Sequence, residues 1–255
     1  ILSSLVGSEM CIRDRINIAD PVGSQVMIKL ISSGICHSQL HQMHDYNLPK
    51  PFLLGHEATG VVMKTGPDCS YVQEGDYVIA TWVRRNPIKG RYLPDLKGVS
   101  YQEKKLNCRI TFTWSEIIMS EDEYIVKIPK KYATPESCIV GCSILTGAGA
   151  VKNTAKVKPG ETVAIFGVGG IGLAAVKMAS LLNASKIIAI DIDSEKLEFS
   201  KQFGATHTIN SIENNPIDEI IDLTNGGVDY AFDAIGKKIT MNQIFESIKQ
   251  GGSGA

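Results

Sequence analysis

The chain has little that would suggest a membrane, nucleic-acid or disulfide-rich protein. Its 255 residues hold 26 Lys and Arg against 27 Asp and Glu, and a formal net charge of −1 gives no electrostatic case for nucleic acid or a membrane as partner. No apolar run is long enough to span a bilayer. Six cysteines in a chain of this length do not make a disulfide framework, which favours a reducing, cytoplasmic location.

The remaining composition is that of an ordinary globular protein, with 44% hydrophobic and 21% charged residues. The length suggests two domains, each able to bury a core. Residues 1–15 begin without Met and lack the order of a signal peptide, so we expect a non-native leader. The chain stops at 251–255 just after a helical pattern, so we expect a fragment of a longer protein.

Patterns of apolar residues divide the rest at about residue 143. The range 16–143 predicts a β-rich domain with a long surface loop at 82–108 and strands at 26–31, 60–64, 76–81, 110–114 and 123–128. A buried helix is expected at 136–150. The range 144–255 alternates strands and helices, which predicts a parallel α/β sheet of βαβ units. The expected strands are 162–166, 186–191, 207–209 and 230–233, and the expected helices are 171–182, 195–203, 216–223 and 239–249.

A glycine-rich turn lies between the first strand and helix of this second domain. Its expected cofactor-binding residues are Gly167, Gly169, Gly170, Ile171 and Gly172. Such glycines let the backbone approach a pyrophosphate, which then rests at a helix N-terminus. Asp191 ends the next strand, where a carboxylate accepts both adenosine ribose hydroxyls and repels a 2′-phosphate. The pattern therefore predicts a Rossmann domain that binds NAD rather than NADP. In the same domain, Ser194 is expected to cap helix 195–203, and Gly204 to stop it.

Three residues ahead of the glycine turn suggest a catalytic metal. Cys36, His56 and Cys142 each lie close behind a glycine, and two thiolates with one imidazole give a tetrahedral zinc with one position open. We expect these three side chains to converge on one zinc. Cys138 is expected to be a core thiol, because a closed site with four ligands would leave no position for a substrate.

With these motifs the chain resembles the zinc-dependent medium-chain alcohol dehydrogenases, over about residues 16–252. The resemblance implies a GroES-like first domain, Cys36, His56 and Cys142 as zinc ligands, and a homodimeric or homotetrameric parent. It further implies that Glu57 can approach the metal, that Ser38 bonds the substrate oxygen and that His41 ends a proton relay. His37 would face the pyrophosphate and Lys196 the adenosine ribose. The implied reaction transfers a hydride between an alcohol and NAD.

The chain departs from this family at two places. Members with a structural zinc have four closely spaced cysteines in the region of 82–108, whereas this chain offers only Cys108, so the second zinc is expected to be absent. Gln39 stands where the family commonly has an Asp bonded to the ligating His. An amide supports that imidazole less strongly, and changes of this kind alter metal affinity about tenfold.

Two alternatives stay open at this point. One is a polyol or sugar-alcohol dehydrogenase of the same fold, in which the third thiolate is often a carboxylate. The other is a zinc-free nucleotide-binding relative without dehydrogenase activity. We also expect the 255-residue chain itself to be inactive, because half of the nucleotide domain would be missing and hydride transfer requires precise positioning.

Overall fold

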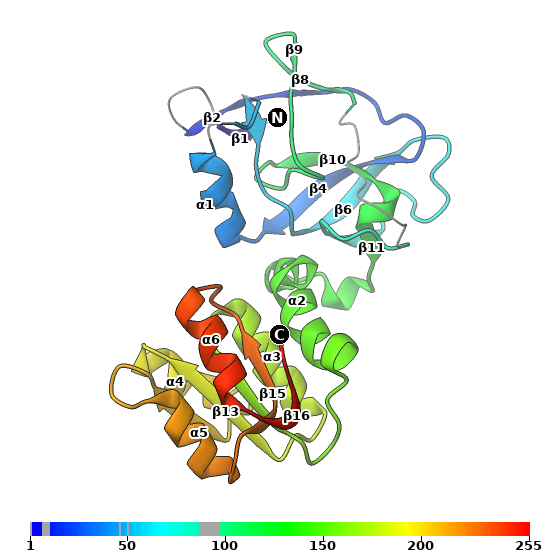
Figure 1. Ribbon diagram of the computed structural model, residues 1–255. Coiled ribbons are helices and arrows are strands. Elements are labelled where there is room, and N and C mark those ends of the chain that lie inside the picture. The colour runs from blue at the N-terminus through cyan, green and yellow to red at the C-terminus, as the bar shows by residue number, and fades with distance from the viewer. Residues whose placement is uncertain (1, 7–10, 46, 50, 87–96) are drawn as a thin grey trace. The chain divides into compact units, whose positions relative to one another are not determined.

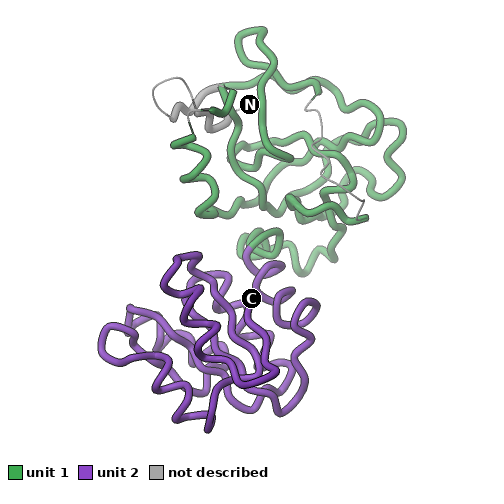
Figure 2. The backbone as a smooth tube through the Cα atoms, viewed as in Figure 1, with its two compact units in different colours: residues 1–142 green, residues 143–255 purple. Residues whose placement is uncertain are grey.

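The computed structural model describes residues 2–6, 11–45, 47–49, 51–86 and 97–255, without the side chains of 2–6 and 11–14. The chain divides into two compact units, Ile1–Cys142 and Ser143–Ala255 (Figure 2). Each unit has its own hydrophobic core. Among the described residues, no helix combines the length and the apolar character needed to cross a membrane.

The first unit is built around an antiparallel sheet of five strands in the order β10-β4-β6-β7-β11 (Figure 1). The strands are β4 (Gln25–Ser33), β6 (Ala58–Thr65), β7 (Tyr77–Ala80), β10 (Ile117–Glu121) and β11 (Ile125–Lys127). Buried side chains such as Val26, Ile28 and Val62 join Phe112 in one core. The predicted β-rich, GroES-like class is confirmed.

Two smaller sheets of three strands also lie in the described part of this unit. One has the order β3-β8-β9, with β3 (Asn17–Ile18), β8 (Val99–Tyr101) and β9 (Lys104–Lys105). The other has the order β2-β1-β5, with β1 (Leu2–Val6), β2 (Cys11–Arg15) and β5 (Phe52–Leu53). The hairpin of β1 and β2 thus pairs with β5, through Leu5 opposite Leu53. That residues 1–15 are a non-native leader stays a prediction, and residues 1 and 7–10 lie outside the described residues.

Three local predictions for the first unit need correction. The segment 110–114 is not a strand; Phe112 and its neighbours are buried, and Trp114 N–H donates to Leu54 O at 3.0 Å, so the pattern marked burial rather than sheet pairing. The expected strand 123–128 is a 3₁₀ turn, η1 (Asp122–Tyr124), followed by β11. Helix α1 (His37–His44) was not predicted, because its sequence has apolar residues at only Leu40 and Met43.

The predicted single helix at 136–150 is also interrupted. It consists of the 3₁₀ helix η3 (Pro135–Gly141), then α2 (Ser143–Gly149), then a π-helical stretch, η4 (Ala150–Ala155). A shorter 3₁₀ turn, η2 (Lys130–Tyr132), precedes them. The break falls at Cys142, whose φ of −140° and ψ of −75° lie outside the helical region. A metal-ligand candidate therefore stands at the point where the helical path is broken.

The second unit contains a parallel sheet of five strands in the order β14-β13-β12-β15-β16. Its strands are β12 (Thr162–Phe166), β13 (Lys186–Asp191), β14 (His207–Asn210), β15 (Val228–Asp233) and β16 (Ile248–Gly254). The first strand lies in the centre and later strands are added on both sides, which is the Rossmann order. The predicted doubly wound class is confirmed.

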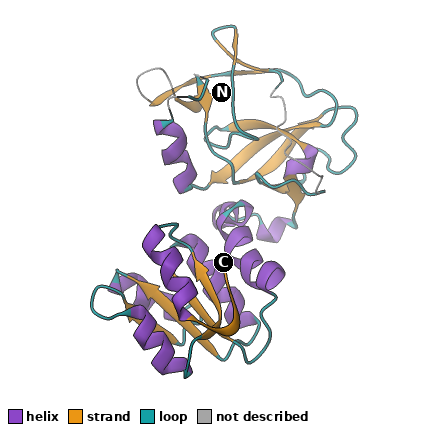
Figure 3. Ribbon diagram, in the orientation of Figure 1, coloured by secondary structure: helices purple, strands orange, loops and turns teal. Residues whose placement is uncertain are grey.

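Helices cover both faces of this sheet, as Figure 3 shows. They are α3 (Gly170–Leu181), α4 (Ser194–Lys201), α5 (Pro216–Thr224) and α6 (Lys238–Ser247). Alternate residues of β12 enter two cores: Ile165 packs with α3 and α4, whereas Phe166 packs with α5 and α6. A central strand buried on both faces accounts for the nearly continuous apolar run in its sequence.

Two predictions for the second unit were wrong in detail. Strand β16 was not predicted, since its glycine-rich sequence has little β-propensity. Helix α4 is capped by Asp193 rather than by Ser194, because Asp193 Oδ1 accepts the N–H groups of Glu195 at 3.0 Å and Lys196 at 3.3 Å. Gly204 follows the helix with a positive φ of 113°, as a helix stop requires.

The cap predicts a difference between two neighbouring substitutions. Asp193→Ala removes the acceptor for two helix N–H groups and should lower the free energy of unfolding by about 1 kcal/mol. Ser194→Ala is the matched control; it removes only a hydroxyl that accepts from Asn210 on the exposed surface, and its effect should be smaller. Urea unfolding followed by circular dichroism measures both. Equal losses would contradict the assignment of the cap.

Candidate metal centre and nucleotide-binding turn

Three segments of the first unit bring Cys36, His56 and Cys142 together. Cys36 lies between β4 and α1, His56 between β5 and β6, and Cys142 directly after η3. Their possible ligand atoms all lie within 4.8 Å of one another, and His56 Nε2 is 3.2 Å from Cys142 Sγ. Residues separated by about a hundred positions in the sequence thus present two sulfurs and one nitrogen to a common point.

The backbone before His56 is fixed by a close approach. Gly55 has a φ of 93°, and a Cβ at this position would lie 2.4 Å from the Thr113 hydroxyl and 2.6 Å from the Trp114 nitrogen. Only glycine fits a left-handed conformation against a neighbouring backbone without strain. The glycine that precedes the imidazole in the sequence therefore has a direct structural role in delivering it.

The electrostatic environment suits a cation. Burial, together with the nearby Cys36 and Glu57, raises the pKa of the Cys142 thiol to about 12, against the opposing effect of a hydrogen bond from Trp82. Burial lowers the pKa of His56, which keeps its imidazole neutral at neutral pH, as a metal ligand must be. A thiolate in this position needs a positive charge beside it. Two thiolates and one imidazole match zinc with an open fourth position, so the residues fit that metal.

Two other predicted residues lie next to this group. Glu57 follows His56 and is only 3% exposed; a Cβ on Gly34 would lie 2.4 Å from its Oε1. Ser38 is the second residue of α1, and its Oγ is 3.4 Å from His56 Nδ1. The structure thus places a carboxylate and a hydroxyl beside the candidate metal ligands.

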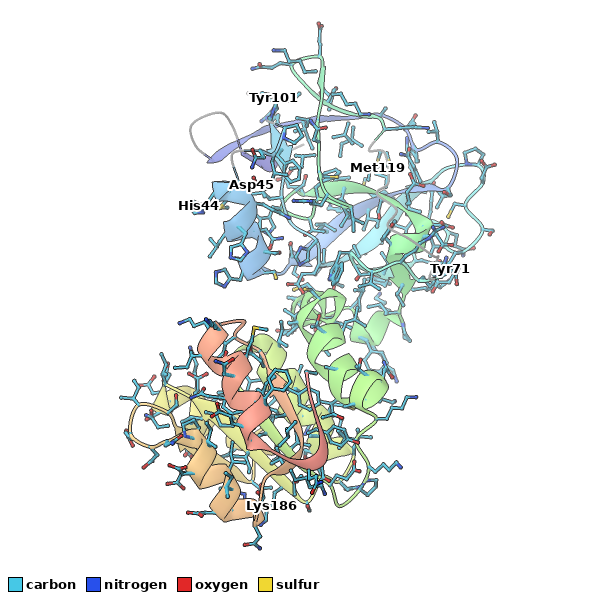
Figure 4. The ribbon with its side chains drawn as sticks, viewed as in Figure 1. His44, Asp45, Tyr71, Tyr101, Met119 and Lys186 are labelled. Atoms are coloured by element: carbon cyan, nitrogen blue, oxygen red, sulfur yellow. The ribbon has the colours of Figure 1, made fainter. Side chains whose placement is uncertain are left out.

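His37 and His41 lie on the exposed part of α1 and contact each other. Their ring centroids are 5.0 Å apart, as expected of residues four apart on a helix. His44 is the last residue of the same helix, where its Nδ1–H donates to Leu40 O at 2.7 Å (Figure 4). His37 and His41 are therefore accessible to water and to a ligand.

Trp82 is a residue of this site that the sequence did not reveal. Its ring meets that of His56 edge to face with centroids 6.5 Å apart, and its indole hydrogen-bonds the Cys142 thiol. The side chain is 42% exposed. The sequence carries no signal for this placement, because an isolated tryptophan looks the same in a core and beside a metal site.

The predicted cofactor-binding glycines occupy the turn from β12 into α3. A Cβ on Gly172 would lie 1.8 Å from Gly167 O, so the helix can follow the strand this closely only with glycine there. Gly169 is different: a Cβ on it would meet no described atom within 4 Å. Gly170 and Ile171 begin α3, where N–H groups are free of intrahelical partners. The turn therefore fits a phosphate group.

Asp191 closes this turn at the end of β13. Its Oδ2 accepts the Val168 N–H at 2.9 Å, and its Oδ1 accepts the N–H groups of Ile192 at 2.8 Å and Asp193 at 3.2 Å. Lys196 extends from α4 to Asp193, with a nitrogen to oxygen distance of 3.7 Å. The predicted carboxylate is thus tied to the glycine turn itself, and the predicted lysine pairs with Asp193, two residues after Asp191.

The metal group predicts different outcomes for two buried cysteines four residues apart. Cys142→Ser should lose most bound zinc, because it removes one of three ligands, whereas Cys138→Ser should keep one zinc per chain, because Cys138 is a buried thiol outside the ligand group. Zinc content after dialysis, measured by atomic emission, separates them. Full zinc retention by Cys142→Ser would refute the assignment of this ligand.

The site and fold agree with the known proteins that the chain resembles. Residues 23–130 match the model of the alcohol dehydrogenase GroES-like domain, and 170–255 match that of zinc-binding dehydrogenases. An alcohol dehydrogenase class-3 from Oryza sativa is 35% identical over 269 residues, covering 95% of this chain and 70% of the relative. An S-(hydroxymethyl)glutathione dehydrogenase from Synechocystis is 34% identical, covering 92% and 71%. The structure of benzyl alcohol dehydrogenase from Acinetobacter calcoaceticus superimposes with a TM-score of 0.91 and 28% identity, covering 100% and 75%. The chain belongs to the zinc-dependent medium-chain alcohol dehydrogenase family.

Proposed function

We propose that the protein is an oxidoreductase that uses zinc and NAD to interconvert an alcohol and its aldehyde or ketone. The observation that carries this proposal is the group of Cys36, His56 and Cys142, whose ligand atoms lie within 4.8 Å of one another. The glycine turn with Asp191 supports it, because the same chain then offers a site for the hydride acceptor.

The residues around the metal centre receive roles in proton transfer. Bound zinc would act as a Lewis acid that lowers the pKa of the alcohol. Ser38 would accept the proton of the alcohol oxygen while passing its own hydroxyl proton on, through the cofactor ribose, toward His41, and the position of its hydroxyl beside His56 supports this role. His41, exposed on the same helix, would release the proton to water. Glu57 would adjust the charge around the metal from its buried position.

The glycine turn would bind the pyrophosphate of NAD. Gly167, Gly169, Gly170, Ile171 and Gly172 would supply the close backbone approach, and His37 a basic group for the same phosphates. Asp191 would accept the adenosine ribose hydroxyls, with Lys196 beside it. A carboxylate there repels a 2′-phosphate, which favours NAD over NADP.

Further parts of the proposal concern zinc content, location and assembly. We expect one zinc per chain, since Cys108 is the only cysteine of 82–108 and four are needed for a structural zinc. We expect a cytoplasmic protein, where cysteine ligands stay reduced, and a homodimer or homotetramer. A sulfur at position 142 disfavours the polyol dehydrogenase alternative, and the ligand group disfavours a zinc-free relative.

The proposal predicts zinc-dependent formation of reduced nicotinamide. The protein, loaded with zinc and mixed with NAD and a panel of primary and secondary alcohols, should give the absorbance of NADH. Chelation of the zinc should abolish the signal. If the protein binds one zinc but reduces NAD with no alcohol of the panel, the proposed reaction is wrong.

The cofactor preference gives a second prediction. Asp191→Ser should weaken NAD binding roughly tenfold or more, because hydrogen bonds to a charged group contribute about 1.5–3 kcal/mol. The preference for NAD over NADP should also become smaller than in the unchanged protein, because the carboxylate that repels the 2′-phosphate is gone. Glu195→Ser is the control, since it removes a charge on the exposed surface of α4 without contact to the turn. Titration of each variant with NADH and NADPH, followed by cofactor fluorescence, measures the ratio of the two dissociation constants. An unchanged ratio in Asp191→Ser would exclude the proposed role.

A further inference from the structure

A chain of hydrogen bonds runs through the candidate metal centre to a buried glutamine. Gln39 is only 1% exposed and lies in the first turn of α1. Its Oε1 is 2.9 Å from the backbone nitrogen of Cys36, and its Nε2 is 2.8 Å from His56 Nδ1. On the other side of the ring, His56 Nε2 is 3.2 Å from Cys142 Sγ. The side chain of Gln39 therefore contacts two of the three ligand residues at once.

The direction of each bond follows from the chemistry of the groups. The Cys36 nitrogen is a donor only, so the amide oxygen of Gln39 must face it. The amide nitrogen then faces His56 and donates to Nδ1, which leaves the ring proton on Nε2. Nε2–H in turn donates to the sulfur of Cys142. The ring is thus held in the tautomer whose unprotonated nitrogen, Nδ1, accepts from Gln39, while Nε2, which faces Cys142, carries the proton.

A metal bound at Nε2 requires the opposite tautomer. The ring proton then lies on Nδ1 and needs an acceptor. With the amide as it stands, two donors would face each other across 2.8 Å. Rotating the amide by half a turn brings its oxygen to Nδ1 but sets its nitrogen against the Cys36 N–H, which is again a pair of donors. One amide oxygen cannot accept from both groups in these positions.

Ser38 offers only partial relief. Its Oγ is 3.4 Å from His56 Nδ1 and 3.3 Å from Gln39 Nε2, so both contacts are longer than a usual hydrogen bond to a hydroxyl. The hydroxyl can accept from Nδ1–H, but it would still leave the amide nitrogen opposed to the ring. The conflict is therefore a property of the amide at position 39.

We propose that Gln39 is a positioning residue that opposes metal binding by holding His56 with its ring proton on Nε2. The inference rests on the proposed function, since it takes Cys36, His56 and Cys142 as zinc ligands. A carboxylate of the same shape would have no such conflict, because one oxygen can accept from Cys36 N–H and the other from His56 Nδ1–H. The side chain at position 39 thus sets how tightly the centre holds zinc.

The first test compares zinc affinity in two variants of α1. Gln39→Glu should bind zinc at least about tenfold more tightly than the unchanged protein, which is the scale of such supporting contacts. Gln42→Glu is the matched control for charge: it places the same charge on the same helix, three residues from position 39, and should change the affinity less than about twofold. Competition with a chromophoric chelator measures both affinities, and the visible spectrum of the cobalt-substituted protein reports whether the ligand set is unchanged.

The second test needs no variant. Nitrogen NMR of the protein labelled at histidine, after removal of metal by chelation, identifies the ring nitrogen of His56 that carries the proton. The proposal requires Nε2 in the unchanged protein and Nδ1 in Gln39→Glu.

The outcomes separate the two proposals. Equal zinc affinity in Gln39→Glu and the unchanged protein, or a proton on Nδ1 in the unchanged protein, would overturn the role of Gln39 and leave the proposed function standing. If Gln42→Glu tightened zinc binding as much as Gln39→Glu, the role of Gln39 would also be overturned, because the added negative charge alone would then explain the tighter binding. Failure of every form to bind zinc would defeat the proposed function together with this inference.

Discussion

The structure of the first unit depends on one constraint: three segments must hold two sulfurs and one nitrogen within 4.8 Å of each other. Strand β4 leads to Cys36, Gly55 fits against Thr113 ahead of His56, and the broken helical path after η3 presents Cys142. None of these segments could shift by a residue without removing its ligand from the group. The positive φ at Gly55 and the non-helical backbone at Cys142 are where the fold accepts unusual geometry for this purpose.

The second unit illustrates a different constraint, the burial of β12 on both faces. Ile165 and Phe166 are neighbours in the sequence but belong to separate cores, each closed by its own pair of helices. Because each core is densely packed, a change of side-chain volume on one face of the strand acts first on the helices that cover that face. The glycine turn follows directly after this buried strand.

The sequence allowed the fold class and the grouping of the site residues to be predicted where the signal was local. Strands β12 and β13 have the predicted bounds because continuous apolar runs next to glycine or aspartate define them. The position of α1 could not be predicted, since its first turn is stabilised by contacts to His56 and Cys36 rather than by an apolar face. The segment 110–114 was wrongly predicted as a strand, and the place of Trp82 beside His56 was not predicted, for a related reason. What a side chain packs against depends on the tertiary structure, which a local sequence pattern does not contain.

Asp191 has a consequence for how a nucleotide would be received. Its carboxylate already accepts three backbone N–H groups, one of them from the centre of the glycine turn. The turn is therefore pre-organised: the conformational entropy of ordering it is lost during folding and does not have to be lost again on association. Under the proposed function, an incoming ribose would share an acceptor that already holds the glycine turn in place.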